Sequence, residues 1–394
     1  MATVAQGESG APALAISDTK SLKRRARLDS TPKNNATAIV YCEGNFGGID
    51  GKTANGLVRH SEKYKILSIV DSEKAGLDSG VVLDGVVNGI PVYSDLLSAL
   101  AQSAVPPQYF IYGCAPASGR LSLNERGILL RAIDLGLNIV SGLHEYLSDD
   151  EEFVAASQRK NVTLTDVRKA RPKSEMHTFS GQIERVTCPR IAVLGTDCAI
   201  GKRTTATVLT RALNDYGLKA VMIGTGQTGL IQGAKYGVAL DAVPSQFCAG
   251  ELEATIVRAF DVEKPDVIIV EGQGALSHPA YSTTSFILRG SKPDGVILQH
   301  APARKHRCDF AQMAMPDPAA EIHLIETFSD TRVIGLTINH EHMLEHEVND
   351  ACDYYQKQLG IPVTDALVHL PTYLVDMFLA AFPNLCVESL VKVH

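Results

Sequence analysis

The segment RIAVLGTDCAIGKRTTATVLTRAL, residues 190–213, constrains the fold more than any other part of the sequence. An apolar strand pattern leads into a glycine-bearing loop, which ends at Lys202 and is followed by a helix-patterned stretch. Backbone N–H groups of such a loop, together with the positive end of the following helix, bind phosphate, and the lysine ammonium reaches over it. The segment therefore predicts a P-loop. The alternative is a Gly-Lys pair that merely starts a helix.

Two departures from the common P-loop bear on its ligand. Five residues separate Gly195 from Gly201, and Arg203 stands where a Ser or Thr usually ligates Mg²⁺. Either Thr204 replaces that hydroxyl and holds Mg²⁺ with ATP, or the bound phosphates carry no metal, as in coenzyme A. Arginine binds oxyanions bidentately and suits the second case. The residues predicted to bind the cofactor are Gly195, Thr196, Asp197, Gly201, Lys202, Arg203, Thr204 and Thr205.

Short β-branched runs alternate with helix-patterned segments from Ala38 onward, which is typical of parallel α/β sheets. Six strands are expected before Pro189, and six more restart at Arg190. We therefore predict an N-terminal Rossmann-like, doubly wound domain and a P-loop α/β domain, with ligands at the carboxyl ends of strands. The predicted limits are a flexible extension at 1–36, the first domain at 37–170, a linker at 171–188 and the second domain at 189–394.

Two ionisable residues follow a strand of the second domain, in DVIIVEGQGALSHPAYS. Glu271 ends the strand, where P-loop enzymes keep an acid that holds Mg²⁺ or acts as a base. His278 lies in the next loop, and an ordinary pKa near 6.5 suits proton transfer. Both are predicted catalytic residues. The alternatives are a rim carboxylate and a surface histidine.

Further polar residues are expected to bind an anionic substrate. ILQHAPARKHRCDF places a local positive cluster at one sheet edge, and the loop IGTGQTGLIQG supplies backbone donors. Arg120 follows the fourth strand and would reach a substrate carboxylate from the first domain. A solvated basic turn is the alternative for the positive cluster. The predicted substrate-binding residues are Arg120, Gly226, Gln227, His300 and Arg304.

The glycine-rich turn EGNFGGIDGKTANGLVRHS follows the first strand but contains no G-x-G-x-x-G. Asp71 ends the second strand, where a dinucleotide fold would hold ribose hydroxyls, yet the fingerprint that should accompany it is missing. NAD binding is therefore a minor alternative. The GKT at 51–53 does not form a second P-loop, because no glycine stands in the right place upstream.

Charge and composition exclude several classes of protein. The formal net charge is −7, and residues beyond the first 36 hold 31 basic and 41 acidic side chains, so nucleic acid is not an expected partner. No apolar stretch approaches the ~18–20 residues that span a bilayer. The eight cysteines form no C-x-x-C pair and no tight Cys/His cluster, which predicts no metal site and no disulfide framework, and fits a reducing cytoplasm.

With these motifs, the chain resembles the bacterial D-glutamate N-acetyltransferase family from about Ala38 to the C-terminus. The resemblance rests on EGNFGGIDGKTANGLVRHS, GTDCAIGK, GTGQTG, EGQGALSHPAYS and the segment around His300. It implies a Rossmann-like domain, a P-loop domain, and transfer of acetyl from acetyl-CoA to the amine of an acidic amino acid. The P-loop half is also similar to dethiobiotin synthetase, through GTD-x-x-x-GK and the glycines after Glu271.

Three functions stay open. The first is an acyl-CoA-dependent amino-acid N-acyltransferase in which Glu271 or His278 deprotonates the substrate ammonium. The second is an ATP-dependent ligase or kinase with Thr204 and Glu271 on Mg²⁺. The third is a nucleotide-regulated binding protein, disfavoured by the many ionisable residues at strand ends. We also expect a homo-oligomer, mediated by an apolar face at Leu374–Phe382, unless that segment is a buried core helix.

Overall fold

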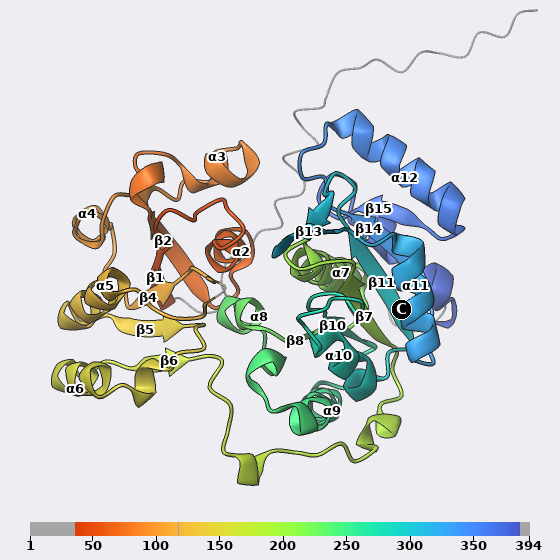
Figure 1. The fold of residues 1–394 in the computed structure, drawn as a ribbon, viewed down its shortest axis with the longest axis horizontal. Helices are drawn as coiled ribbons and strands as arrows, with labels where there is room; N and C mark the ends of the chain where they lie inside the picture. The colour runs from red at the N-terminus through yellow and green to blue at the C-terminus, as the bar shows by residue number, and fades with distance from the viewer. Residues whose placement is uncertain (1–35, 117, 387–394) are drawn as a thin grey trace, which may run out of the picture.

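The computed structural model describes residues 36–116 and 118–386, which form two parallel sheets with helices between the strands (Figure 1). The predicted class, a Rossmann-like domain followed by a P-loop α/β domain, is confirmed. The predicted extension at 1–36 lies outside the described residues except for Ala36. The domain limits drawn from the sequence stay a prediction.

The first sheet has the strand order β3-β2-β1-β4-β5-β6, which is the order of a doubly wound dinucleotide fold. Its strands pair in parallel, and their apolar residues form one buried core with the helices on both faces. The strands are β1 Ala36–Tyr41, β2 Tyr64–Val70, β3 Val92–Tyr93, β4 Tyr109–Tyr112, β5 Asn138–Ser141 and β6 Leu164–Asp166. The helices are α2 Lys52–His60, α3 Ser79–Asp84, α4 Leu96–Ala101, α5 Leu123–Asp134 and α6 Glu151–Lys160.

The second sheet has the order β15-β14-β11-β7-β10-β8-β9, so β7, which leads into the predicted P-loop, is central. The strands are β7 Arg190–Gly195, β8 Ala220–Gly224, β9 Tyr236–Gly237, β10 Val267–Glu271, β11 Gly295–His300, β14 Val333–Ile338 and β15 Val363–Asp365. The helices are α7 Lys202–Tyr216, α8 Gln227–Gln232, α9 Ser245–Glu263, α10 Thr283–Ser291, α11 Pro318–Phe328, α12 Glu345–Leu359 and α13 Thr372–Ala381. Because parallel strands point the same way, the loops after β7, β8, β10 and β11 share one edge of this sheet.

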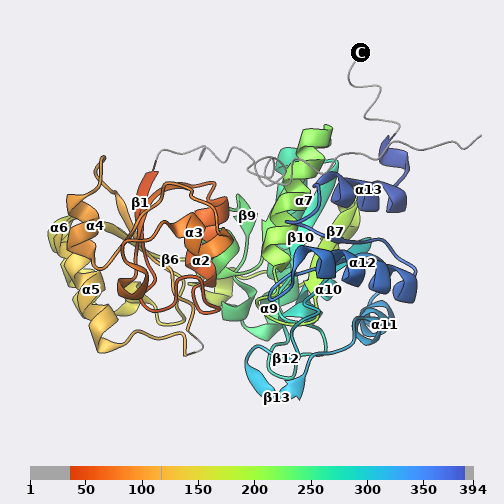
Figure 2. The same cartoon turned by 90° about the horizontal axis from the view of Figure 1, so that it is seen from above.

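Two points of the sequence analysis change with the structure. The segment after β11 contains a small antiparallel pair, β12 His306–Arg307 and β13 Phe310–Ala314, that the alternating pattern did not predict (Figure 2). Helix α13 buries four apolar side chains in the core, those of Leu374, Val375, Met377 and Phe378. This favours a buried core helix over an exposed face that would mediate an oligomer.

The residues between β6 and β7 form an irregular connection that packs along α9. Gly250 permits this approach, since a Cβ there would lie 2.3 Å from the His177 carbonyl oxygen. The Glu253 carboxylate accepts hydrogen bonds from the backbone N–H groups of Ser180 and Ile183, at 2.7 and 3.1 Å. Buried carboxylates on α9 therefore fix the connection in place.

Helices α2 and α8 lie side by side where the two sheets face each other (Figure 1). The hydroxyls of Thr53 and Thr228 are 3.2 Å apart, and Arg168 donates to Gln227 and pairs with Asp241 at 2.7 Å. The glycine-rich turn that precedes α2 is therefore brought next to the loops of the second sheet.

Within the described ranges, no helix has both the length and the apolar character needed to cross a membrane.

Candidate functional site

The loop between β7 and α7 presents unsatisfied backbone donors. Gly201 precedes α7 with φ at +101°, a left-handed conformation that glycine adopts without strain, and Ala199 also has a positive φ of 49°. No side chain caps the N-terminus of α7, and its first turn holds no acidic residue. The first N–H groups of this 15-residue helix are therefore available to an anion, as the sequence predicted for a phosphate loop.

Lys202 is buried beneath this loop, and its ammonium donates to the carbonyl oxygen of Asp197. Burial lowers its pKa, because the charged form loses hydration. The charge of Lys52, the first residue of α2, acts in the same direction, so this lysine of the first half of the chain lies near the loop. A phosphate at the loop would meet positive charge from both halves of the chain.

Arg203 does not extend from the helix N-terminus as the sequence suggested. Its guanidinium donates to Gln232 Oε1 at 2.8 Å and lies 3.8 Å from Glu271 Oε2. The Glu271 carboxylate also accepts from the Thr225 N–H at 3.1 Å. Burial raises the pKa of Glu271, against the opposing effect of the charge on Arg203. The two residues thus form a buried pair of opposite charges beside α8.

The two threonines after Arg203 differ in their surroundings. The Thr205 hydroxyl donates to Gln299 Oε1 at 2.6 Å, and Thr337 donates to the same oxygen at 2.6 Å, so Thr205 is held within the sheet edge. Thr204 is half-buried on the first turn of α7. The sequence analysis missed Gln299, although its place at the end of β11 next to His300 was a usable signal.

Asp197, like Thr196 before it in the loop, has no exposed surface. Its Oδ2 accepts from the Cys308 N–H at 2.8 Å and from Arg304 at 3.0 Å. Arg304 also donates to the carbonyl oxygen of Cys198 at 2.9 Å and pairs with Glu341 at 2.7 Å. The Arg304 guanidinium therefore binds the protein's own carboxylates and holds the loop at Cys198, and its predicted role in substrate binding stays a prediction.

His278 faces the same aspartate. Its Nε2 lies 3.7 Å from Asp197 Oδ1, and both atoms are buried without a hydrogen-bond partner among the described residues. Its Nδ1 accepts from the Ala280 N–H at 3.2 Å, and its ring stacks on Tyr281 with centroids 4.6 Å apart. Burial lowers the pKa of His278, and the nearby Arg307 lowers it further. His278 is thus a neutral, enclosed residue and not the loop-surface histidine of the alternative.

His300 does not belong to a positive cluster. Its ring nitrogens are hydrogen-bonded to the hydroxyls of Thr196 and Tyr355, at 2.9 and 3.2 Å. Burial lowers the pKa of His300 to about 4, so it is neutral at physiological pH. Both nitrogens are hydrogen-bonded to protein groups, so the predicted role of His300 in binding an anionic substrate would require one of these bonds to be exchanged.

Protonation of His300 should make the protein less stable in acid. An unfolded histidine takes up a proton near pH 6.5, whereas His300 in the folded state does so near pH 4. The unfolded state therefore binds more protons between these values, and up to ~3 kcal/mol of stability is lost as the pH falls. Denaturant unfolding at pH 7 and pH 5 measures this slope. His300→Gln should flatten it, and the exposed His323→Gln should not; equal slopes in all three proteins would contradict this origin.

The other predicted substrate-binding residues are spread out. Arg120 is exposed in the turn after β4, and the structure brings it into no hydrogen bond with the predicted site residues among those described. Gly226 precedes α8, near Gln273. Gln227 is buried and accepts from Arg168 at 2.9 Å, which the sequence did not indicate. Arg307 is buried and donates to Ser277 Oγ at 2.8 Å. Of the five predicted substrate-binding residues, Arg120 is the one whose side chain is exposed to solvent.

The fold brings together potential metal ligands that are scattered in the sequence. Ligand atoms of Asp197, Cys198 and His278 lie within 4.8 Å of one another, as do those of Cys198, Cys308 and Asp309. The chemistry of the first group does not favour a metal ion. Because Nδ1 of His278 accepts an N–H, the neutral ring carries its proton on Nε2, the atom that would ligate the metal. Lys202 and Arg304 add positive charge to the same place.

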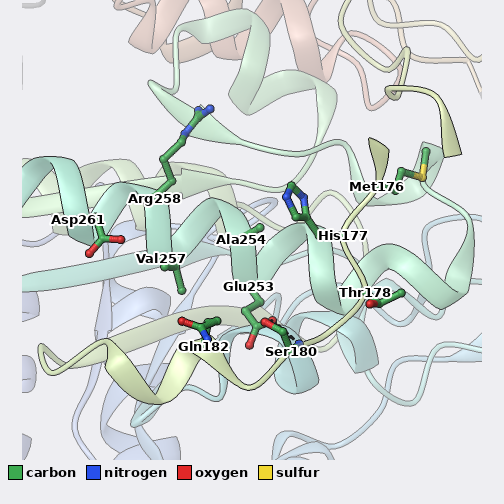
Figure 3. Close-up of a pocket in the computed structure, with 10 residues that line it drawn as sticks. All are labelled: Met176, His177, Thr178, Ser180, Gln182, Glu253, Ala254, Val257, Arg258 and Asp261. Atoms are coloured by element: carbon green, nitrogen blue, oxygen red, sulfur yellow. Dashed lines mark hydrogen bonds between the residues drawn. The ribbon is translucent and has the colours of Figure 1, made fainter. Parts of the chain in front are cut away.

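Two open cavities lie outside the loop itself. One, of about 560 Å³, runs between α9 and the irregular connection before β7, with Ser180, Gln182 and Glu253 gathered on one side and Arg258 on another (Figure 3). The other, of about 390 Å³, lies between α10 and α11 and is lined by Tyr281, Leu324 and Phe328 next to His278. Only the second adjoins the predicted site.

The chain matches two profiles of proteins of unknown function: a DUF1611 P-loop domain over residues 177–375 and a DUF1611 Rossmann-like domain over residues 72–170. It is 32% identical over 290 residues to a D-glutamate N-acetyltransferase from a Pseudoalteromonas species, covering 71% of this chain and 85% of that protein. It is 30% identical over 280 residues to a protein of the same name from Tritonibacter scottomollicae, covering 68% and 80%. A crystal structure of a DUF1611 family protein from Anabaena variabilis superposes with a TM-score of 0.79 at 29% identity, over 88% of this chain and 99% of that one.

Proposed function

The chain belongs to the DUF1611 family, and we propose that it is an N-acetyltransferase that moves the acetyl group of acetyl-CoA to the amine of a small acidic amino acid such as D-glutamate. Two relatives named D-glutamate N-acetyltransferase, each about 30% identical over most of their length, support the reaction class. The phosphate loop, with Lys202 beneath it and Lys52 nearby, supplies the charge that the phosphates of coenzyme A require.

One observation carries the choice of acetyl-CoA over Mg-ATP. In a P-loop enzyme that uses Mg²⁺, the hydroxyl after the lysine and the acid at the end of the neighbouring strand hold the metal. Here Arg203 stands at the first position and pairs with Glu271 at the second. The guanidinium takes the place that the cation would fill and supplies positive charge itself. This pairing favours a donor whose phosphates bind without metal.

The transfer requires a base and an oxyanion site. The substrate ammonium loses one proton to the base, and its nitrogen attacks the thioester carbonyl. The carbon–sulfur bond then breaks, the nitrogen loses its second proton to the departing sulfur, and coenzyme A leaves as a thiol. We assign the base to Glu271, since burial raises its pKa toward the working pH. The Gly226 N–H donates to the Glu271 carboxylate. The proposed oxyanion donors are therefore the backbone N–H groups in the first turn of α8 near Gly229, which lies against that carboxylate. With the phosphates at the phosphate loop and the thioester beside Glu271, the pantetheine chain of acetyl-CoA must fold back over the phosphate loop.

The recognition of the acceptor is assigned to exposed cations. His300 and Arg304 are engaged within the protein, whereas Arg120 and Lys52 are exposed. Both belong to the first sheet's half of the chain: Arg120 lies in the turn after β4, and Lys52 is the first residue of α2. We propose that they hold the carboxylates of the acceptor at the junction between the two halves.

Calorimetry with acetyl-CoA and with ATP, each in Mg²⁺ and in EDTA, tests the proposal. We expect acetyl-CoA to bind equally well in both buffers and ATP to bind in neither. An assay of acetyl transfer to D-glutamate, L-glutamate and D-aspartate then identifies the acceptor. Mg²⁺-dependent ATP binding would overturn the proposal in favour of a ligase or kinase.

Lys202→Met should weaken acetyl-CoA binding about 10–100-fold, because a hydrogen bond to a charged group contributes roughly 1.5–3 kcal/mol. Methionine keeps the length of the side chain, so the buried site beneath the loop stays filled. Titration calorimetry on the variant measures the loss, and the exposed Lys357→Met on α12 is the matched control. If Lys202→Met binds acetyl-CoA as tightly as the wild type, the phosphates of acetyl-CoA do not bind at this loop.

A further inference from the structure

Four of the eight cysteines form two close pairs, each placed where neighbouring strands end. Cys42 follows β1 and hydrogen-bonds to Cys114, which follows β4. Cys198 follows β7 in the phosphate loop, and Cys308 follows β11 next to β12. We propose that Cys198 and Cys308 form a reversible disulfide that holds the phosphate loop in a shape with low affinity for its anionic ligand.

The geometry brings the two thiols within reach of each other. Their sulfur atoms lie no more than 4.8 Å apart. The backbone N–H of Cys308 donates to Asp197 Oδ2 at 2.8 Å, so the two segments are already held together one residue before Cys198. A disulfide requires about 2.05 Å between the sulfurs. Closing it therefore needs a movement of at most about 3 Å, which side-chain rotation and a small shift of the loop can supply.

The pair is also accessible and reactive, in contrast to the other pair. Cys198 and Cys308 are each partly exposed, whereas Cys42 and Cys114 are buried. The hydrogen bond from Cys308 lowers the pKa of the Cys198 thiol, and the charge of Lys202 acts in the same direction, although burial opposes both. The thiolate is the form that attacks a disulfide. The hydrogen bond with Cys114 and burial raise the pKa of Cys42, and the hydrogen bond with Cys198 and burial raise the pKa of Cys308 in the same way. The two pairs therefore differ in their exposure and in the lowered pKa of the Cys198 thiol.

Oxidation would change the loop because Cys198 lies between the residues that shape it. Arg304 holds the Cys198 carbonyl oxygen, and the next residue, Ala199, has a positive φ that a non-glycine residue adopts only under constraint. Drawing Cys198 toward β12 turns these peptide units, so their N–H groups no longer converge on one anion. By the same linkage, a bound anion should protect the two thiols.

The chemistry balances with a low-molecular-weight disulfide such as oxidised glutathione as the oxidant. The Cys198 thiolate attacks one of its sulfurs, forms a mixed disulfide and releases one glutathione thiolate, which takes up a proton. Cys308 then loses its proton to water, and its thiolate attacks Cys198 Sγ and releases the second glutathione. Two protein thiols are oxidised and one glutathione disulfide is reduced to two thiols.

The experiment uses the full-length protein in glutathione buffers of increasing oxidised fraction, with peptide mapping by mass spectrometry and acetyl-CoA calorimetry on the same samples. We expect one cross-link, between the peptides of Cys198 and Cys308, at least a tenfold loss of affinity, and recovery of both with dithiothreitol. Cys308→Ser should stop at the mixed disulfide on Cys198. Cys352→Ser, a buried cysteine outside both pairs, should behave as the wild type.

Several outcomes would overturn the inference. They are the absence of the cross-link, a cross-link at Cys42 and Cys114 instead, and a reversible cross-link that leaves the affinity unchanged. A stoichiometric Zn²⁺ that Cys198→Ser releases would make the pair a metal site instead. Failure of the reduced protein to bind acetyl-CoA would count against the proposed function alone; the comparison of reduced and oxidised protein then uses inorganic pyrophosphate, and equal binding would overturn the inference.

Discussion

Glu271→Gln should lower kcat for acetyl transfer by about 10²–10⁴-fold, the contribution usual for a positioned general base. Glutamine keeps the size of the side chain and can still accept from the Thr225 N–H, but it cannot take the proton of the substrate amine. Because burial raises the pKa of Glu271, activity of the wild type should fall as the pH drops through that raised value. The acid limb of the kcat profile should disappear in the variant. Steady-state kinetics from acid to neutral pH measure both effects.

Removing a charge from a buried site can also lower kcat by distorting the structure, so a matched variant is needed. Glu251 on α9 is equally buried and pairs with Arg171 and His177, remote from the phosphate loop. Glu251→Gln should change stability without changing the pH profile of kcat. If Glu271→Gln keeps a kcat within a few-fold of the wild type, Glu271 is only the counter-ion of Arg203, and the assignment of the base is wrong.

The sequence predicted the architecture well because the signals that set it are local. The apolar run before the predicted P-loop forms β7, Arg190–Gly195, and the helix-patterned stretch that follows the loop forms α7, Lys202–Tyr216. A parallel sheet buries both faces of its strands, so each reads as a short continuous apolar run between helices. The pair β12 and β13 was missed because Phe310–Ala314 is mostly exposed and carries no such run.

The site was predicted less completely, because partners from distant parts of the chain decide the role of each charged residue. The sequence could place Arg203 and Glu271 at one sheet edge but could not show that they pair with each other. The same limit applies to His300, whose neutrality depends on burial and on hydroxyls 104 and 55 residues away. The cysteine pair likewise joins residues that lie far apart in the sequence. The spacing of residues in the sequence can indicate a site formed within one turn or loop. It cannot indicate a site whose residues come together only in the folded chain.

Arg304→Met should destabilise the second half of the chain by about 3–5 kcal/mol, because it leaves the buried charge of Asp197 without its cation. Methionine preserves much of the side-chain volume, so most of the loss comes from charge and hydrogen bonding. For a domain of this size, the thermal midpoint should fall on the order of 10 °C. Thermal unfolding followed by circular dichroism measures the change, and donor affinity should fall with it, since Arg304 also holds the loop at Cys198.

An exposed ion pair supplies the comparison for this prediction. Nη2 of Arg185 donates to both oxygens of Asp261 at 2.9 Å, and both side chains are about half exposed. Arg185→Met should therefore cost no more than about 1 kcal/mol. Adding Asp197→Asn to Arg304→Met should recover part of the loss, because the uncompensated charge is removed. If Arg304 instead binds the acceptor's carboxylate, Arg304→Met would leave the thermal midpoint unchanged and raise KM for the amino acid alone. The two readouts therefore separate a residue that shapes the loop from one that holds the substrate.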